Sequence, residues 1–530
     1  MKLVLFTNGT FSTMDGSGRR VESMLVAGDR IIEVGTVWEV AAHPLAPEAQ
    51  KVDLQGKRVL PGLIDTHVHF AAYAESKGAV DLSECRSISE VVDKLRAQAQ
   101  NTPPGSWIRG MNFDHTQFVE KRMPTREELD IIENLVFLTR VCFHVHSVNS
   151  KALEAAGYTG GWSIPTGVEK DANGELTGVI YEKGIDRIAD AYHRAMGNTE
   201  THLDRMAQCM QEFASYGITA FNTTSAEHLG IVENFGIYQD LRRMGKLLQR
   251  VTVHYNDLPA KGMQSFFGDT MIRYGGLKLF SDGGFCAQTG AMTFDYKDRP
   301  GHKGVLNYTD KELYELVIEA QKQGVQVAIH TVGDRALDQV LDVFETVMTE
   351  VPKPYLRHRI IHCYIAKGDQ RKRIASLGLI VDVQPRFLAD EIDIAESGIP
   401  QEFLRDAYAW KALWHDGVLL AGGSDCPAAH PNPWLGIDAA VNRLRAKDRT
   451  PVGGWHPEQK LTLDEAIALY TKNAAKALGM FKDLGTLEPG KLADFVVLED
   501  DPWKIDPQDL GKVRVREVYR GGERIYSAGK

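Results

Sequence analysis

Histidines stand at the ends of several short apolar segments of this 530-residue sequence. His67 and His69 end the run that begins at Pro61, and His330 and His362 each end a run of their own. The period-2 alternation of a strand would point the His67 and His69 imidazoles to the same side. Neutral imidazole is a common ligand of zinc and similar metals. The pattern indicates a metal site, although a single strand-end histidine is more often a hydrogen-bonded core residue.

A carboxylate and a lysine extend this set of candidate ligands. Asp425 directly follows the run Val418–Ser424, where it could bind metal and carry a proton. The alternative is an Asx turn before Pro427. Alternation directs Lys278 to the interior of the expected sheet, where desolvation favours a neutral amine that can add carbon dioxide to form a carbamate, an oxygen ligand able to bridge two metals. The alternative for Lys278 is a salt bridge to Asp282 or Asp425.

Strand-like and helix-like segments alternate from about residue 63 to residue 479, and they must position these side chains. Such alternation is typical of βα units around a parallel sheet. In a TIM-type (β/α)8 barrel, the C-terminal ends of the strands meet at the active-site mouth. We therefore predict an α/β protein with such a barrel. The eight expected strands are Leu63–His69, Ile218–Asn222, Arg250–Tyr255, Leu277–Phe280, Gln326–His330, Arg359–His362, Leu379–Val383 and Val418–Ala421.

A long separation between the first two expected strands predicts an inserted domain. It spans about 145 residues, far more than one crossover needs. The segment contains an amphipathic stretch at Ser89–Gln98 and strand-like stretches at Trp107–Asn112 and Leu135–Val141. Thr125–Glu128 is a capping box that opens a helix. We interpret residues 71–205 as an α/β lid or substrate domain over the barrel mouth.

Both ends of the chain contain short strand-like runs between glycine turns, and we expect them to pair into one composite β-sandwich. Another capping box, Thr462 to Glu465, predicts a helix that continues to Gly479 and closes the barrel. The expected domains are residues 1–60 with 481–530 for the sandwich, 61–70 with 206–480 for the metal-binding barrel, and 71–205 for the insert.

The composition excludes several classes of protein. Hydrophobic residues make up 43% and charged residues 25%, as in ordinary globular proteins. The net charge is −10 without a basic stripe, so we expect neither nucleic acid nor acidic lipid as a partner. Apolar runs are short and no signal-peptide core is present, so we expect a cytoplasmic protein without a membrane span. The six cysteines form no CxxC pair and are expected to be reduced.

The order HxH, lysine, histidine, histidine, aspartate, between two halves of a β domain, resembles the amidohydrolase superfamily of metal-dependent hydrolases. The resemblance spans nearly the whole chain. Further blocks are similar to the YtcJ-like (amidohydrolase 3) branch, which includes N-substituted formamide deformylases. These blocks are Gly105–Gly110, Pro124–Asp130, His144 with Val148–Leu153, Gly174–Gly178, Lys278–Gly283 and His330–Arg335.

The resemblance implies a binuclear metal centre bridged by a carboxylated lysine. Zinc is the default for imidazole and carboxylate ligands, and iron or manganese would fit the same cage. The expected centre therefore holds two zinc ions per chain. One ion would be held by His67, His69, Lys278 and Asp425, and the other by Lys278, His330 and His362.

The substrate must be inferred from the insert and the loops. His144 and Asn149 match the branch pattern and are expected to hydrogen-bond a substrate carbonyl or amide. Several aromatic residues could form an apolar wall for a substrate, although such residues more often belong to the core. These are Trp107, Phe113, Trp162 and Phe285.

Together these features predict hydrolysis of a C–N bond other than a peptide bond in a small molecule such as an amide or formamide. A hydroxide activated by the metals would attack, and Asp425 would pass its proton to the leaving amine. One alternative is a mononuclear deaminase or an esterase/lactonase on the same scaffold, with Lys278 unmodified. Another alternative is a binding protein without catalytic activity, but the complete set of metal ligands argues against it. The sequence leaves the substrate and the oligomeric state open, with a homodimer as one expectation.

Overall fold

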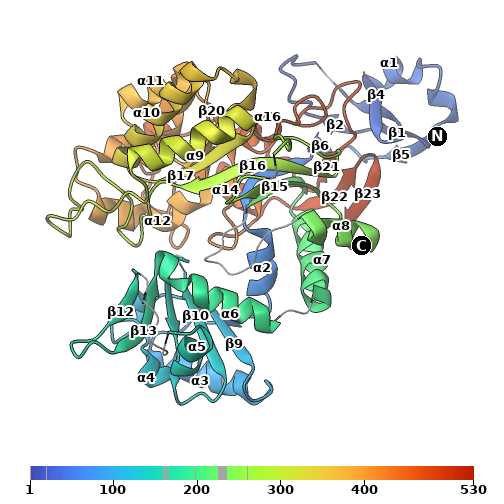
Figure 1. The fold of residues 1–530 in the computed structure, drawn as a ribbon. Helices are drawn as coiled ribbons and strands as arrows, with labels where there is room; N and C mark the ends of the chain where they lie inside the picture. Colours follow the sequence, from blue (N-terminus) through green and yellow to red (C-terminus); the bar gives the residue numbers. More distant parts are fainter. Residues whose placement is uncertain are drawn as a thin grey trace.

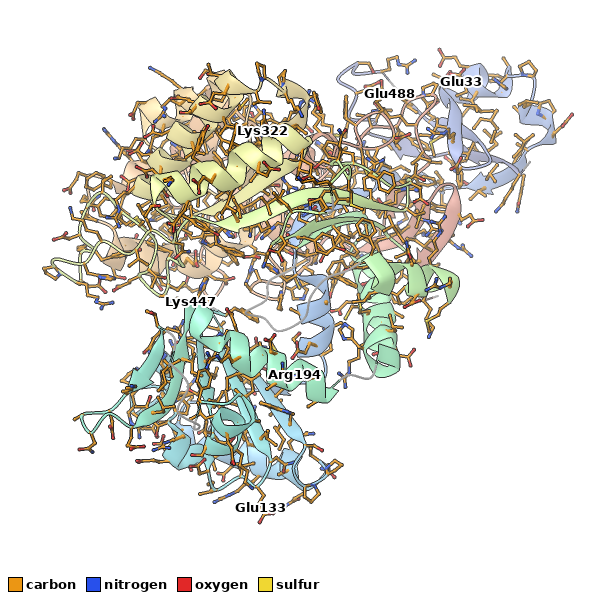
Figure 2. The ribbon with its side chains drawn as sticks, in the orientation of Figure 1. Glu33, Glu133, Arg194, Lys322, Lys447 and Glu488 are labelled. Carbon is orange, nitrogen blue, oxygen red and sulfur yellow. The ribbon has the colours of Figure 1, made fainter. Side chains whose placement is uncertain are left out.

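The fold is given by a computed structural model that describes residues 2–19, 21–141, 143–158, 164, 166–196, 199–224, 235–259 and 261–529. A barrel with its surrounding helices lies between a β-rich part and an insert (Figure 1). Glu33 and Glu488 mark the β-rich part, and Glu133 marks the end of the insert that is farthest from the barrel (Figure 2). Trp162, one of the four aromatic candidates, lies outside the described residues.

Eight parallel strands form the central sheet, which confirms the predicted TIM-type barrel. The sheet is nearly closed, because the N–H groups of His69 and Asp425 donate to the carbonyls of Cys426 and His67, both at 2.7 Å. These bonds join the end of the first strand to the segment after the last. The strands are β7 (Leu63–Val68), β14 (Ile218–Thr224), β15 (Arg250–Tyr255), β16 (Ile272–Phe280), β17 (Gln326–Thr331), β18 (Arg359–His362), β19 (Ile380–Val383) and β20 (Leu419–Gly422).

Strand β16 begins five residues earlier than the sequence predicted, and two glycines account for the difference. A Cβ atom on Gly275 would lie 2.3 Å from the His254 imidazole, and one on Gly276 would lie 2.1 Å from the Gln326 carbonyl oxygen. Only glycine at these positions therefore lets the neighbouring strands β15 and β17 pack this closely against β16. The same glycines weakened the strand pattern in the sequence.

Helices follow most of the barrel strands and pack against the outside of the sheet (Figure 1). Many begin at side-chain caps; for example, Thr309 and Glu312 form a capping box at the start of α9. The helices are α2 (Phe70–Ser76), α7 (Thr199–Ser215), α8 (Phe235–Arg243), α9 (Asp310–Gln323), α10 (Asp334–Glu350), α11 (Gly368–Ser376), α12 (Pro385–Gly398), α13 (Trp410–His415), α14 (Pro433–Asn442), α15 (Leu463–Leu469) and α16 (Lys472–Ala477).

The prediction of one continuous helix from Thr462 to Gly479 is wrong. The capping box at Thr462 is present, but the helix ends after Leu469, and α16 starts only at Lys472. The carbonyl of Tyr470 accepts the N–H of Ile64 at 2.7 Å, so this group pairs with the barrel instead of continuing the helix. The pairing interrupts the helical hydrogen-bond ladder.

The two ends of the chain pair in a β-rich part of two sheets. Strand β6 of the N-terminal segment runs antiparallel to β21 of the C-terminal segment, and one hydrophobic core contains residues of both sheets. The composite sandwich in the predicted fold class is therefore present. Its strands are β1 (Leu3–Thr7), β2 (Thr10–Phe11), β3 (Ser23–Ala27), β4 (Arg30–Gly35), β5 (Gln50–Asp53), β6 (Arg58–Pro61), β21 (Phe495–Leu498), β22 (Val515–Arg520) and β23 (Glu523–Ser527).

The insert contains its own six-stranded sheet, in the order β12-β13-β11-β10-β9-β8. Its helices are α3 (Ile88–Ala99), α4 (Arg126–Leu129), α5 (Ser150–Ala155) and α6 (Asp186–Met196). Its strands are β8 (Val80–Asp81), β9 (Trp107–Phe113), β10 (Leu135–Arg140), β11 (Val145–Val148), β12 (Val168–Lys170) and β13 (Leu176–Tyr181). The bounds given above for the three domains stay a prediction. None of the helices in the described ranges is long and apolar enough to span a membrane.

Candidate metal centre and cavity

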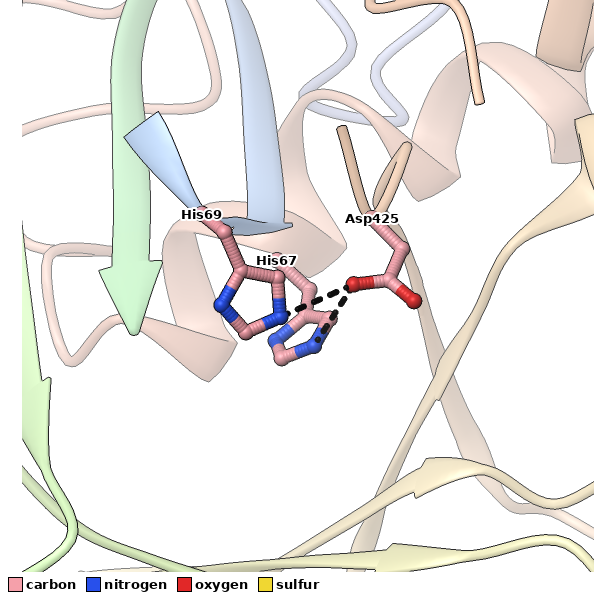
Figure 3. Close-up of side chains that lie close together, drawn as sticks. All are labelled: His67, His69 and Asp425. Carbon is pink, nitrogen blue, oxygen red and sulfur yellow. Dashed lines mark ion pairs between the residues drawn. The ribbon is translucent and has the colours of Figure 1, made fainter. Parts of the chain in front are cut away.

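Two histidines and one aspartate meet at the mouth of the barrel (Figure 3). His67 Nε2 lies 3.2 Å from Asp425 Oδ1, and His69 Nε2 lies 3.1 Å from the same oxygen. One candidate ligand atom from each of the three residues lies within 4.8 Å of the others. His67 lies near the C-terminal end of β7, His69 directly follows that strand and Asp425 follows β20, so barrel closure brings them together.

A buried carboxylate, Asp65, fixes the two segments that carry these side chains. Its Oδ1 accepts the N–H of His67 at 3.1 Å and the N–H of Ser424 at 3.0 Å. Gly423 allows the close approach, because a Cβ atom there would lie 2.8 Å from the His67 nitrogen. The Asp425 side chain is therefore held facing the imidazoles.

His330 near the end of β17 and His362 at the end of β18 lie beside this group, with their ring centroids 4.6 Å apart. The His362 Nδ1–H donates to Gln384 Oε1 at 2.6 Å, and the His330 Nε2–H donates to the Gly283 carbonyl at 3.2 Å. Each bond selects one tautomer, because the nitrogen that donates must carry the proton. His362 Nε2, which lies 3.9 Å from Asp425 Oδ2, and His330 Nδ1 then keep their lone pairs.

The histidine and aspartate side chains of this site are in the protonation states that can bind a metal ion. Burial lowers the pKa values of His67 and His330 well below their usual range and lowers the pKa of His362 to about 4, so these imidazoles are neutral at pH 7. Burial alone would raise the pKa of Asp425, but the adjacent His67 and His69 hold it well below its usual value. The arrangement offers neutral nitrogen ligands around an ionised carboxylate.

Lys278 points into the same site from β16. Its Nζ is buried without a hydrogen-bond partner among the described residues and lies 4.0 Å from the centroid of the Phe280 ring. Burial lowers the pKa of Lys278 to about 7, which makes the neutral amine accessible. Within the described part of the chain, no ion pair joins Lys278 to Asp282 or Asp425 within 4.0 Å. Asp282 instead accepts backbone N–H groups from Ala291, Val332 and Gly333.

The polar atoms of this site fit a bound cation. Among the described residues, the buried Lys278 Nζ has no hydrogen-bond partner, and the buried His67 Nε2 and Asp425 Oδ1 have no polar neighbours closer than the 3.1–3.2 Å contacts of this group. Buried polar atoms are normally paired, so such a group is a candidate set of metal ligands. The atoms surround a cavity of about 50 Å³ that His330 and His362 also line. This donor set suits a divalent metal.

A larger cavity of about 290 Å³ adjoins the candidate metal residues. His330, His362 and Asp425 line one side of it, and the insert covers it with Asp114, Arg140, Val141 and His144. His144 also lines the smaller cavity, with its ring 6.3 Å from the His330 ring. His144 thus lies where a residue that contacts substrate would be expected.

Asn149 lies elsewhere, and this corrects the expectation that it contacts substrate. Its side chain is fully buried and lines neither cavity. Oδ1 accepts the N–H of Val136 at 3.0 Å and the N–H of Ala152 at 3.1 Å, so Asn149 caps α5 and ties it to β10.

Of the aromatic candidates for a substrate wall, two belong to the core of the insert and one lines the larger cavity. Trp107 packs against Tyr192 and Phe113 packs against Phe118, with ring centroids 5.5 Å and 6.0 Å apart, inside the insert. Phe285 lines the larger cavity.

Sequence reasoning missed one wall of the larger cavity, which α12 provides. Phe387, Asp390, Glu391 and Ile394 line it. Their spacing of three, four and seven residues is that of one helical face. This spacing was visible in the sequence, but only the barrel shows that the face turns toward the mouth.

Comparison with known proteins gives consistent matches over almost the full chain. The model of a family described as the amidohydrolase family matches residues 50–526. YtcJ of Bacillus subtilis, assigned to the amidohydrolases, is 28% identical over 98% of this chain and 99% of its own. The N-substituted formamide deformylase of Arthrobacter pascens is 29% identical over 99% of this chain and 98% of its own. A crystal structure of an uncharacterized metal-dependent hydrolase from Pyrococcus horikoshii is 29% identical, with a TM-score of 0.79 and coverage of 96% and 99%.

Proposed function

The chain belongs to the amidohydrolase family, and we propose that it hydrolyses a C–N bond other than a peptide bond in a small amide, formamide or related compound. The observation that carries the proposal is the convergence of buried imidazole, carboxylate and amine groups at the barrel mouth, next to a cavity of about 290 Å³. A cavity of this size suits a small molecule. The formamide deformylase relative supports the formamide class in particular.

Two divalent ions, with zinc as the default, form the cofactor in this proposal. Support comes from the neutral imidazoles and from the buried, unpaired Lys278 amine, which carboxylation would convert into a bridging ligand. The proposed ligands of one ion are His67, His69, Asp425 and carboxylated Lys278, and those of the other are carboxylated Lys278, His330 and His362.

Bound divalent ions would lower the pKa of water and polarise a substrate carbonyl. Asp425 supplies the proton transfer, because its carboxylate faces both His67 and the larger cavity and can take a proton and deliver it to the leaving amine. His144 stands across the cavity, where it can hydrogen-bond the substrate carbonyl or amide. Phe285 and Val332 form part of the apolar wall of the cavity.

A panel of small substrates tests this function. We expect the purified protein to release amine from N-alkyl formamides or simple amides, measured by an amine-reactive dye. Esters, lactones and aminated heterocycles of matched size serve as controls. Hydrolysis confined to esters or lactones, or ammonia release from heterocycles alone, would contradict the proposal and favour the alternative reactions.

Gln384 should affect metal binding through His362, whose Nδ1–H it accepts at 2.6 Å. Groups that orient metal-bound histidines typically contribute about 10–100-fold to affinity. We therefore expect Gln384→Ala to weaken metal binding by about this factor, measured by competition with a chromogenic chelator. Gln384→Glu keeps an acceptor and should lose less. Equal affinity in Gln384→Ala and wild type would refute the role of His362 as a ligand.

A further inference from the structure

Glu391 places a carboxylate in the wall of the larger cavity, away from the candidate metal residues. It lies on the α12 face that lines the cavity, with Phe387 one turn before it and Ile394 almost one turn after it. The aromatic ring of Tyr364 also lines this wall, with its centroid 5.8 Å from the ring of His362. Glu391 and the candidate metal residues thus border one continuous space.

The hydrogen-bond partners of Glu391 among the described residues are all neutral. The Tyr408 hydroxyl donates to Oε2 at 2.6 Å, and the Cys286 thiol donates to Oε1 at 3.0 Å. Tyr364 is a third hydrogen-bonding neighbour. No ion pair within 4.0 Å joins Glu391 to a basic group of the described residues. Burial therefore raises the pKa of Glu391 to about 7, and a nearby cation would favour its ionised form.

The other acidic side chains in this cavity already have basic partners. Asp390 pairs with Arg386 at 2.9 Å, and Asp114 pairs with Arg140 at 2.7 Å. Asp425 belongs to the proposed metal centre. A carboxylate in a low-dielectric wall is costly unless a cation or several donors compensate it. Among the described residues, Glu391 has hydrogen-bond donors but no cationic partner.

We propose that Glu391 binds a positively charged group of the substrate, so that the substrate is an amide or formamide whose amine portion carries a second, protonated nitrogen. The inference rests on the proposed function. The carbonyl would lie at His330, His362 and Asp425, and the ammonium group at Glu391. Phe285, Val332 and Ile394 line the same cavity and offer apolar surface to the connecting carbon chain.

Two formamides of equal length test the proposal. N-(4-aminobutyl)formamide carries an ammonium group where N-pentylformamide carries a methyl group. We expect kcat/KM of the wild-type enzyme to favour the aminobutyl compound by about tenfold or more, a typical effect of a charge-assisted hydrogen bond. In Glu391→Gln the ratio should fall to near one, because the amide keeps the shape and loses the charge.

Asp393→Asn is the matched control, since it removes a carboxylate of the same helix that lies outside the larger cavity and pairs with Arg445 and Lys447, and it should keep the wild-type ratio. A wild-type ratio near or below one, or a ratio that survives in Glu391→Gln, would overturn the role of Glu391. Should Glu391→Gln fail to fold, a wild-type ratio near or below one still overturns the proposal.

A binding measurement separates this proposal from the proposed function. Calorimetric titration with 1,4-diaminobutane needs no turnover, and we expect wild type to bind it about tenfold more tightly than Glu391→Gln. If neither formamide is hydrolysed but the diamine still distinguishes the two proteins, the proposed reaction fails and the cation site stands. Equal binding of the diamine by both proteins would overturn the cation site.

Discussion

Asp425→Asn is expected to retain most of the bound metal and to lose activity by about 10²–10⁴-fold, the usual contribution of a general acid–base group. Asparagine keeps an oxygen that can face His67 and His69. It cannot take up a proton at neutral pH, so the leaving amine would depart unprotonated. The loss should therefore appear in kcat more than in KM, measured with the best formamide of the substrate panel.

Asp393→Asn provides the matched control for this variant. Asp393 lies on α12, is exposed, and pairs with Arg445 and Lys447 outside the larger cavity. The Asp393→Asn variant should keep the wild-type kcat and metal content. Normal turnover in Asp425→Asn would remove Asp425 from the proton transfer. Loss of all metal from that variant would instead assign Asp425 a role as ligand alone.

The barrel could be predicted from the sequence because its strands are short, apolar and ended by distinctive residues. Arg250–Tyr255 and Arg359–His362 have the predicted bounds. Parallel strands place their C-terminal ends at one mouth, so the topology itself implied that His67, His330 and Asp425 would meet. Strands that are buried on both faces form continuous apolar runs, which can be recognised in the sequence without knowledge of long-range contacts.

What the sequence did not predict depends on tertiary contacts. The helix break at Tyr470 follows from a hydrogen bond to Ile64, about 400 residues away in the chain, and no local propensity reports such a bond. Asn149 has the same residue type whether it caps a helix or binds substrate, and only its burial distinguishes the two roles. The sequence shows Glu391 only as an acidic residue of a helix. Its place in a cavity wall could not be predicted, because segments distant in the chain form that cavity.

Substitution of Lys278 is expected to lower both metal content and activity, because Lys278 is the proposed bridge between the two metal ions. We expect about two divalent ions per wild-type chain purified from medium with bicarbonate, by analogy with other two-metal hydrolytic sites. Lys278→Ala should fall to about one ion or fewer and lose nearly all hydrolysis, because neither ion keeps its shared ligand. Elemental analysis by mass spectrometry, alongside kcat/KM, measures both effects.

Lys278→Met separates loss of the bridging ligand from loss of packing. Methionine preserves much of the side-chain volume against Phe280 and has no amine to carboxylate. If the carbamate is the bridge, both variants should lose metal equally, and ¹³C-bicarbonate should label wild type alone in an NMR spectrum. One ion per chain in all three proteins, with no labelled carbamate, would contradict the bridge and support a mononuclear site, in which Lys278 remains a free amine. Metal loss in the alanine variant alone would mean that Lys278 acts by filling space, because methionine replaces its volume but not its chemistry.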